Sequence, residues 1–520
     1  MKMATTINVV KPEPTNDGQD PPKILNFETV ASYNWLDEPT PTILVPGTPP
    51  IWVPPQISPA LKPDIGGRYI DQNADRTPGS PLQALIHAVQ TCQPDFDFTN
   101  VDIVTDRKPV RCLLGFVNAE PVAFKFGITV VGNTALFTRM EERTRDQPSR
   151  RYNGYRDAFE QQYTRISASA ARSTSHHRVV KYDFADQTIL VRYAVDAYLG
   201  DLAKALMHAD GIENADPGPL VKQRENMNIE GNPPSKTLSS NTPVTVIDGG
   251  RHIPHAATLE LTTRTKHSQA PDSIEQKLPD FWISQTLNYH LCLHRETKEK
   301  ASHSTIFHRI RLIPMGDLLL DWEKTNAEKL RALGHVLRQV IEAAKELGGS
   351  CIVSSDKSEG ASLKVSRAEE DEVPALPKDM RSLFLPIKNE AVDVPMKQEE
   401  VAGQDGTRKR KSGTEHAPEL TGSPPARRTA LNSISRTPGE VTVPIEDGGV
   451  TKTASTRAYD GTRKRKLDAE DAPELTDWPP ARRRALISVL STSEEVVTTI
   501  KEEEPSVKIK NEPVDTEMAL

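Results

Sequence analysis

The sequence predicts a mixed α/β (α+β) fold, in which a mixed β-sheet core is flanked by helices and lies between disordered N- and C-terminal tails. Hydrophobic residues recur with strand or helix spacing only between residues 67 and 350. Beyond residue 355 this periodicity gives way to blocks of Pro, Ser, Glu and Lys. Only 36% of the 520 residues are hydrophobic, whereas a globular domain has about 45–50% apolar residues. A large part of the chain therefore cannot bury enough surface to fold.

The strands of this domain are predicted from runs of β-branched and aromatic residues, and two pairs of runs are joined by short turns. The expected strands lie at 122–140 (two strands turning at Gly132-Asn133), 177–198 (two strands turning at Ala185-Asp186), 258–265 and 306–315.

Helices are predicted where apolar residues recur every three or four positions. Ser80-Pro81 is a cap and a first-turn proline that open a helix running to Val89. Residues 281–293 are interpreted as a helix. The strongest helix signal covers 326–348, where Gly348 ends a regular apolar stripe.

The segments around this domain have a different composition. Residues 1–23 are polar and predicted to be disordered, and residues 210–250 are predicted to be a surface insertion. Residues 24–66 contain many prolines and are interpreted as an extended arm laid on the domain. Residues 351–520 are predicted to be a disordered tail. The anchors expected for the arm are Trp35, Leu44, Val45 and Trp52.

Composition excludes several classes of protein. The net charge of −7 is close to neutral for this length, so the whole chain is not a basic coat for nucleic acid. The 4 cysteines are far apart and form no CxxC pair, which excludes a disulfide scaffold and a zinc ribbon and suits a reducing compartment. No apolar run reaches the roughly 18 residues of a membrane span, and the N-terminus lacks the apolar stretch of a secretory signal.

The tail contains a duplicated motif, GTRKRKSGTEHAPELTGSPPARR from Gly406 and GTRKRKLDAEDAPELTDWPPARR from Gly461. Two copies are too few for a solenoid, so the repeat is interpreted as a linear binding motif. Its basic clusters predict recognition by an import receptor and a location in the nucleus; a solvated charge run is the alternative. The basic residues are Arg408, Lys409, Arg410, Lys411, Arg463, Lys464, Arg465 and Lys466.

A second short pattern, an aliphatic residue followed by Lys, any residue and Glu, occurs five times in segments expected to be disordered. Chance would give roughly one occurrence. The pattern resembles the consensus for conjugation of the ubiquitin-like modifier SUMO, which implies the SUMO machinery as a partner. The alternative is a charged tail with alternating signs. The modified lysines would be Lys11, Lys388, Lys397, Lys501 and Lys510.

Five short segments within the domain carry residue types suited to phosphoryl chemistry. In-line attack of water on a phosphodiester requires divalent cations held by clustered carboxylate and carbonyl oxygens. Alternate residues of a strand share a face, so an acidic pair two positions apart supplies two such ligands. The segments are Val104–Arg107, Gly154–Glu160, Ala194–Asp196, Glu260–Thr262 and Trp282–Gln285.

The order of these segments resembles the decapping exoribonuclease family, eukaryotic RNA 5′-end hydrolases with a PD-(D/E)XK-like core, and suggests a divergent fungal-type member. The resemblance implies RNA as ligand and Mg²⁺ or Mn²⁺ as cofactor. It implies metal ligation by Asp196, Glu260 and the carbonyl of Leu261, with Glu160 holding a metal-bound water. It also implies contacts from Arg107 and Gln285 to the phosphate backbone.

The sequence departs from the family pattern at two positions. Ala194 stands where the resemblance calls for Glu, and Thr262 stands where it calls for Lys. Loss of one oxyanion-type donor costs about 10²–10³ in rate, and a metal ligand is lost as well. A fold that is kept while catalysis is lost or strongly reduced is therefore expected.

Each site residue also has a simpler interpretation. Glu160 could pair with Arg156 on the same helix, and Asp196 could cap a helix that starts near residue 201. Glu260 could be a surface strand residue, and Arg107 could pair with Asp102 or Asp106.

Two further groups of residues are also considered. The arginine-rich stretch 139–156 either lines a phosphate channel or forms a self-paired loop. His176-His177 indicates a turn rather than a metal site.

Three functions are compatible with these patterns. The first is a nuclear domain that binds RNA 5′ ends with little or no hydrolysis, and the second is a non-catalytic nuclear scaffold regulated by SUMO. The third, a prenyl diphosphate synthase, is disfavoured because the chain has no adjacent Asp-Asp pair and too many strands. The oligomeric state is not predicted.

Overall fold

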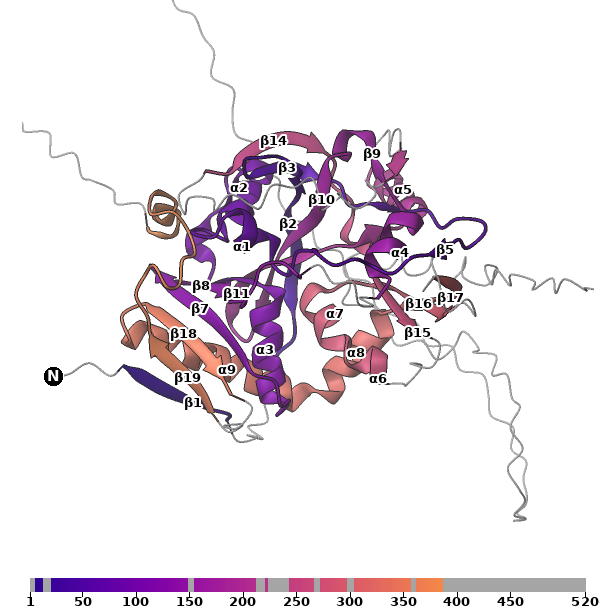
Figure 1. Cartoon of the computed structure of the whole chain (residues 1–520). Helices are drawn as coiled ribbons and strands as arrows, with labels where there is room; N and C mark the ends of the chain where they lie inside the picture. Colours follow the sequence, from indigo (N-terminus) through magenta and orange to yellow (C-terminus); the bar gives the residue numbers. More distant parts are fainter. Residues whose placement is uncertain are drawn as a thin grey trace, which may run out of the picture. The chain divides into compact units, whose positions relative to one another are not determined.

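The computed structural model describes residues 5–12, 20–147, 154–211, 220–222, 243–265, 272–296, 304–356 and 362–386. These residues form a mixed α/β structure with two β-sheets (Figure 1), as the sequence predicts. The two sheets rule out the all-helical fold of a prenyl diphosphate synthase. No helix in the described ranges is long and apolar enough to cross a membrane. The predictions for the tail, including Lys388, Lys397, Lys501, Lys510 and the basic clusters, lie outside the described residues.

The first sheet has eleven strands in the order β1-β19-β18-β7-β8-β6-β11-β10-β2-β3-β14. It is mixed, because β6 runs parallel to both β8 and β11, and β3 runs parallel to β14. The strands are β1 (Thr6–Val10), β2 (Leu25–Leu36), β3 (Thr42–Gly47), β6 (Ile103–Asp106), β7 (Phe124–Val131), β8 (Thr134–Arg139), β10 (Ser173–Phe184), β11 (Gln187–Ala194), β14 (Thr245–Gly250), β18 (Ser350–Ser355) and β19 (Ser362–Arg367).

The second sheet has eight strands in the order β13-β9-β4-β12-β15-β16-β17-β5. Its longest ladder joins β15, β16 and β17, where β15 and β16 are parallel and β16 and β17 antiparallel. The strands are β4 (Ile51–Trp52), β5 (Ala60–Leu61), β9 (Thr164–Ser167), β12 (Ala197–Tyr198), β13 (Leu220–Lys222), β15 (Thr258–Thr265), β16 (Asn288–Glu296) and β17 (Thr305–Pro314).

Helices cover both faces of the first sheet. The α-helices of the described residues are α1 (Gln72–Arg76), α2 (Gln83–Cys92), α3 (Arg107–Val117), α4 (Arg156–Tyr163), α5 (Gly200–Ala209), α6 (Asp272–Glu275), α7 (Leu278–Ser284), α8 (Gly316–Thr325) and α9 (Ala327–Glu346). Short 3₁₀ turns lie at Phe98–Asn100, Ala168–Ala170, His255–Ala257 and Asp379–Phe384.

Alternation along the strands divides the core into two layers. Ile103 packs with α3, α7 and α9, whereas the next residue, Val104, packs with α2 on the other face. The same alternation separates Val180 from Val179 on β10. Because successive strand side chains point to opposite faces, a central strand flanked by helices on both sides is apolar throughout.

The predicted turns and the long helix are confirmed. Ala185 and Asp186 both have positive φ angles, 51° and 61°, as a two-residue hairpin turn requires. Gly132, with φ of 59°, joins β7 to β8. The α9 helix lies within the predicted range 326–348 and ends at Glu346, two residues before Gly348, whose φ is 99°.

The interpretation of residues 24–66 as an arm laid on the domain is wrong. β2 is an interior strand between β10 and β3, and Trp35 is fully buried. The prolines did not prevent pairing because the first one in this stretch after residue 24 is Pro39, beyond the end of β2. The twelve residues of β2 keep all their backbone donors.

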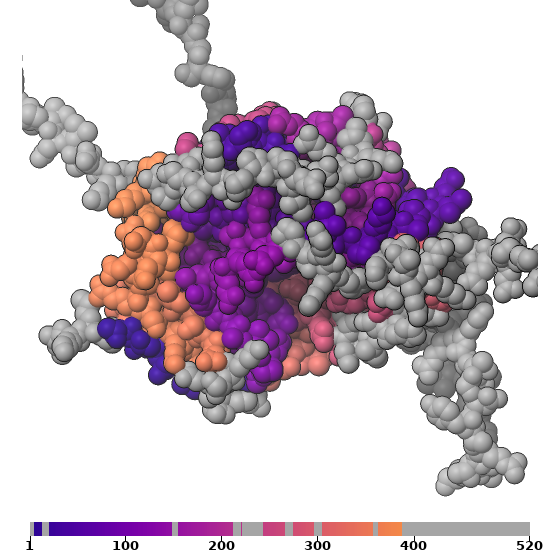
Figure 2. Space-filling view, viewed as in Figure 1, coloured from indigo at the N-terminus to yellow at the C-terminus, as the bar shows by residue number. Residues whose placement is uncertain are grey.

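The boundaries of the expected disordered tails also need correction. β1 pairs with β19, so residues near the N-terminus lie beside residues 362–367 (Figures 1 and 2). The folded region therefore continues to residue 386. Val9 on β1, Val353 on β18 and Val365 on β19 are buried. These strands are short and also contain polar residues, so their apolar pattern is weak in the sequence. Likewise, β14, within the expected insertion 210–250, forms an edge of the first sheet.

The helix predicted over 281–293 is also wrong. The chain forms α7 up to Ser284, turns at Gln285 with φ of 52°, and continues as β16 from Asn288. The run of apolar residues is compatible with either a helix or a buried strand, and the left-handed residue in its middle divides it.

Candidate functional site

The end of β6 and the end of β11 bring the first site residues to one edge of the sheet. The two strands are parallel, with Arg192 opposite Asp106. Arg107 begins α3 directly after β6, and Asp196 follows two residues after the end of β11. Because parallel strands end at the same edge, Arg107 and Asp196 lie on the same side of the molecule.

β12 and β15 then position two acidic residues side by side. Ala197 pairs with Leu259 in an antiparallel ladder, which places the preceding Asp196 next to Glu260 and Leu261. The backbone N–H of Leu261 donates to Asp196 Oδ2 over 2.8 Å. Asp196 is therefore not the cap of α5, whose N-cap is Leu199.

Helix α4 adds a third carboxylate and a cation. Glu160 and Arg156 are four residues apart and lie on the same helical face. Arg156 Nε donates to Glu160 Oε1 over 2.8 Å, and Arg156 Nη2 donates to Asp196 Oδ1 over 2.9 Å. The simple pairing expected for Glu160 is thus present, and the same guanidinium also reaches the acid on the strand.

Arg107 completes the cluster. Its Nη1 lies 3.6 Å from Glu260 Oε2, and its Nε lies 3.9 Å from Asp280 Oδ1. It does not pair with Asp102 or Asp106, because Asp102 accepts from the backbone N–H of Thr188, and Asp106 from Arg192. The structure therefore brings three carboxyl groups and two guanidinium groups together. We name this set the acidic cluster; it consists of Arg107, Arg156, Glu160, Asp196 and Glu260.

Gln285 is directed elsewhere. Its side-chain amide donates to the carbonyl of Trp282 over 2.7 Å, which caps α7. Its own carbonyl accepts a hydrogen bond from His255 Nε2 over 2.7 Å. The expected contact from Gln285 to a phosphate backbone has no support from this geometry.

Burial and charge act against each other in the acidic cluster. Burial, followed by the Glu260 carboxylate, raises the pKa of Asp196. Burial raises the pKa of Glu160 to about 8, although the Arg156 guanidinium opposes this shift. For Glu260 burial alone would raise the pKa, but Arg107 and other cations hold it below its usual value. Burial therefore outweighs the cations at Glu160 and Asp196, whereas the cations outweigh burial at Glu260.

The described residues do not fit a divalent cation as they are arranged. No group of three or more His, Cys, Asp or Glu side chains in the described ranges could hold a metal ion. The Arg156 guanidinium lies between Glu160 and Asp196, and the second oxygen of Asp196 accepts from a backbone N–H. Ala194 is exposed at the end of β11 and contributes no carboxylate, and Thr262 on β15 contributes no cation.

A cavity of about 410 Å³ opens beside the acidic cluster. Glu260 and Thr262 line it together with Arg264, which is the next residue on the same face of β15. Lys277, the residue before α7, also lines the cavity. The full set of lining residues also includes Arg68, Gly154, Tyr155, Arg156, Leu261, Thr263, Thr265 and His294.

Sequence reasoning missed the cations of this cavity. Arg264 carried a usable signal, because it follows Glu260 and Thr262 at the two-residue spacing of a strand face. Lys277 carried none, because its approach to Glu260 and Asp196 depends on how α7 packs against the second sheet.

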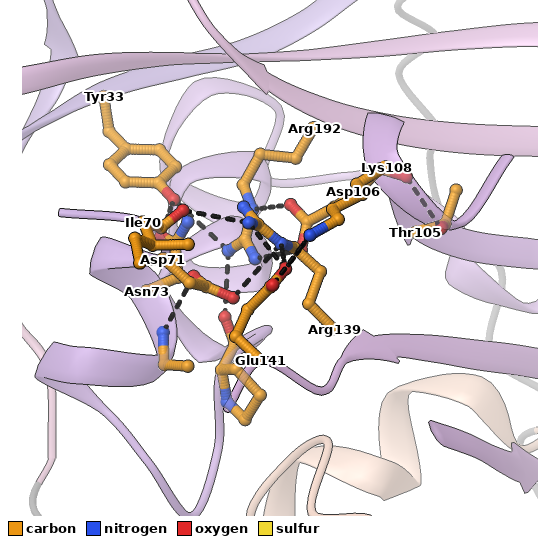
Figure 3. Close-up of polar contacts among 12 residues, drawn as sticks. Tyr33, Ile70, Asp71, Asn73, Thr105, Asp106, Lys108, Arg139, Glu141 and Arg192 are labelled. Carbon is orange, nitrogen blue, oxygen red and sulfur yellow. Dashed lines mark hydrogen bonds and ion pairs between the residues drawn. The ribbon is translucent and has the colours of Figure 1, made fainter. Parts of the chain in front are cut away.

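A second polar group, shown in Figure 3, explains part of the arginine-rich stretch. Arg139 pairs with Glu141 at 2.8 Å and with the buried Asp71 at 3.5 Å. Arg145 pairs with Asp75 at 2.8 Å. Those two arginines are self-paired rather than free for phosphate.

The centre of that group is a buried ion pair. Arg192 is fully buried, and its Nε and Nη2 donate to the two carboxylate oxygens of Asp106 over 2.7 and 2.9 Å. Tyr33 Oη donates to Asn73 Oδ1 over 2.6 Å, and Arg192 Nη1 reaches the Tyr33 hydroxyl at 3.3 Å. Because its charges are matched within the protein, we assign this group to stability rather than to ligand binding.

His176 and His177 do not form a turn. Both are buried in β10, where His176 Nδ1 lies 2.7 Å from Asn34 Oδ1 and His177 stacks on Tyr33. The four cysteines are also all described and form no disulfide.

A family model described as "Domain of unknown function (DUF8563)" matches residues 16–385. The chain belongs to this family. The match covers the whole acidic cluster of this DUF8563 member and ends before the duplicated basic motif at residue 406. No curated protein matches the chain.

Solved structures similar to this DUF8563 member include Rai1 and Dxo1 proteins. One is Rai1 of S. pombe, with 11% identity and a TM-score of 0.44, covering 70% of this chain and 100% of that chain. Another is Rai1 of Candida albicans in complex with pU5-Mn²⁺, with 11% identity and a TM-score of 0.44, covering 73% and 99%. A third is Dxo1 of K. lactis in complex with manganese, with 11% identity and a TM-score of 0.40, covering 70% and 98%.

Proposed function

We propose that the described domain binds the phosphorylated 5′ end of RNA in the cavity beside the acidic cluster, with hydrolysis lost or strongly reduced. The observation that carries this proposal is the charge of the cavity wall. Arg68, Arg156, Arg264 and Lys277 line it, whereas Glu260 is its one acidic residue among those described and is paired with Arg107. Such a cavity favours an anion.

Two of these cations are available to a ligand. Within the described ranges neither Arg264 nor Lys277 forms an ion pair; Arg264 has only a 3.5 Å contact with the carbonyl of Thr263. Arginine and lysine are the side chains that contact phosphates in nucleic-acid complexes. RNA is the expected ligand because the five sequence segments resemble the decapping exoribonuclease family.

The proposed loss of hydrolysis follows from three positions. Ala194 and Thr262 lack the carboxylate and the ammonium that the family pattern requires. Arg156 satisfies two of the remaining carboxylates. A water molecule at this site would have no divalent cation to lower its pKa and no lysine to stabilise developing charge.

Binding is tested with two oligoribonucleotides of one sequence, one with a 5′-monophosphate and one with a 5′-hydroxyl. Fluorescence anisotropy should show tighter binding of the phosphorylated strand, and gel analysis in Mn²⁺ should show no product from it. Arg264→Ser should weaken binding of the phosphorylated strand by about ten- to a hundredfold, because a hydrogen bond to a charged group contributes about 1.5–3 kcal/mol.

The matched control is Arg311→Ser, which removes an exposed arginine from β17, outside the cavity. This variant should retain the preference for the 5′-phosphate. Equal binding of both strands would refute the proposal of 5′-end recognition. Efficient Mn²⁺-dependent hydrolysis would refute the proposed loss of catalysis. Absence of any RNA binding would favour the scaffold function.

Nuclear location is proposed on the basis of the two basic clusters, Arg408–Lys411 and Arg463–Lys466. Replacement of both clusters by alanine in a fluorescent fusion of the full chain should move the protein out of the nucleus. An unchanged distribution would refute import through these clusters.

SUMO conjugation is proposed at the five lysines of the aliphatic-Lys-x-Glu pattern. Lys11 is the one that lies within the described residues; it is exposed and directly follows β1 rather than lying in a disordered segment. Conjugation in a reconstituted system should fall when the five lysines are replaced by arginine. Unchanged conjugation would exclude these sites.

A further inference from the structure

The Arg156 guanidinium occupies the centre of the acidic cluster. One of its nitrogens lies 2.8 Å from Glu160 Oε1 and another lies 2.9 Å from Asp196 Oδ1. The two acids come from different elements, one from α4 and one from the segment between β11 and β12. A planar guanidinium presents several donors at fixed angles, so a single arginine can bridge two carboxylates.

The remaining groups of the acidic cluster are also satisfied within the protein. Asp196 Oδ2 accepts from the backbone N–H of Leu261 at 2.8 Å. Glu260 lies 3.6 Å from Arg107. Both arginine cations have raised pKa values, mainly through Glu160 and Asp196 for Arg156 and through Glu260 for Arg107, against the opposing effect of burial. The two guanidinium groups together supply the two positive charges that one divalent cation would supply.

We propose that the Arg156 guanidinium takes the place of a divalent cation in the acidic cluster, so that the cluster is stable and charge-compensated without metal. Arg156 is covalently attached and always charged, and it donates hydrogen bonds to carboxyl oxygens of Glu160 and Asp196, so it competes with any ion for the same oxygens. Hard cations require those carboxylate oxygens as direct ligands at about 2.0–2.6 Å. This inference concerns metal only and does not depend on RNA binding.

The proposal predicts that removal of one side chain creates a metal site. Arg156→Met leaves Glu160, Asp196 and Glu260 with one guanidinium fewer, and it frees oxygens of two carboxylates. Clustered carboxylates without a counterion attract a hard divalent cation. The Arg156 side chain is 48% exposed, so its loss removes little packing.

Mn²⁺ alone is the probe, followed by electron paramagnetic resonance of the free ion and by the melting temperature of the full chain. The wild-type protein should show no saturable Mn²⁺ binding at this site. Arg156→Met should bind Mn²⁺ at least about tenfold more tightly than the wild type, because the guanidinium that competes for the oxygens of Glu160 and Asp196 is gone. Mn²⁺ should raise the melting temperature of this variant selectively.

Arg68→Met is the matched control, because Arg68 lines the same cavity but pairs with Asp146 at 3.3 Å instead of the acidic cluster. It should bind Mn²⁺ no better than the wild type, and Asp196→Asn should abolish the gain in Arg156→Met. An equal gain in Arg68→Met would overturn the proposal.

The titration of the wild-type chain, compared with Asp196→Asn, tests the proposal without the Arg156→Met variant. Saturable Mn²⁺ binding to the wild-type chain that Asp196→Asn removes would mean that metal displaces Arg156, and the proposal would fail. Arg156→Met that is folded by circular dichroism but gains no Mn²⁺ affinity would overturn it equally. RNA binding is measured separately, so failure of either proposal is distinguishable from failure of the other.

Discussion

Replacing Arg192 by Met should reduce the free energy of unfolding by about 3–5 kcal/mol, because it leaves the Asp106 carboxylate buried without its partner. Arg192 is fully buried, and both of its bonds to Asp106 are charge-assisted, at 2.7 and 2.9 Å. Burial on its own would raise the pKa of Asp106, and Arg192 is the main cation that instead holds it below its usual value. Met has a similar volume, so the effect reports charge rather than a cavity.

Arg178 on the neighbouring strand β10 provides the matched comparison. It is also fully buried, but its side chain makes one hydrogen bond, to the carbonyl of Ile253 at 2.7 Å. Its Nε and Nη1 have no partner within the described residues, and burial lowers its pKa. Arg178→Met removes an uncompensated charge and should leave stability unchanged or raise it by about 1–4 kcal/mol.

Urea unfolding measures the free energy of unfolding of both variants, and the slope of that energy against urea concentration should stay unchanged. A double change of Arg192→Met with Asp106→Leu should recover most of the loss, because no buried carboxylate remains. Equal losses in Arg192→Met and Arg178→Met would show that buried volume, not the matching of charges, determines stability here.

Two other predictions concern pH and catalysis. Burial lowers the pKa of His177 to about 3. Between pH 6.5 and 3 the unfolded chain therefore binds a proton that the folded chain does not, and stability falls as pH falls. From pH 7 to pH 5 this residue lowers the free energy of unfolding by about 2 kcal/mol. His177→Phe keeps the stacked ring and should remove that part of the pH dependence in denaturant titrations, whereas an identical pH profile would contradict the assignment. The triple variant Ala194→Glu, Thr262→Lys and Arg156→Met should release product from 5′-phosphorylated RNA in Mn²⁺ about tenfold faster or more than the wild type. The double variant that keeps Arg156 should stay near the wild-type rate. Equal rates for the triple and double variants would contradict the role of Arg156.

Local patterns predicted the parts of the fold that depend on neighbours in sequence. The turn at Ala185-Asp186 and the helix that ends before Gly348 follow from residues a few positions apart. Strand periodicity likewise predicted the strand that carries Glu260, and it placed Asp196 next to a strand, in the short gap between β11 and β12. These features are set by short-range sterics and by the spacing of apolar side chains.

Pairings between distant residues were not accessible to such patterns. β2 becomes an interior strand because β10, more than 130 residues later, supplies its hydrogen-bond partners. Arg107 pairs with Glu260 instead of the nearby Asp102 or Asp106, because the tertiary fold commits those two acids to other donors. The sequence therefore determined which chemical groups the site contains. Only the tertiary structure determined that Arg156 lies between Glu160 and Asp196, because ion pairing depends on distance in space rather than along the chain.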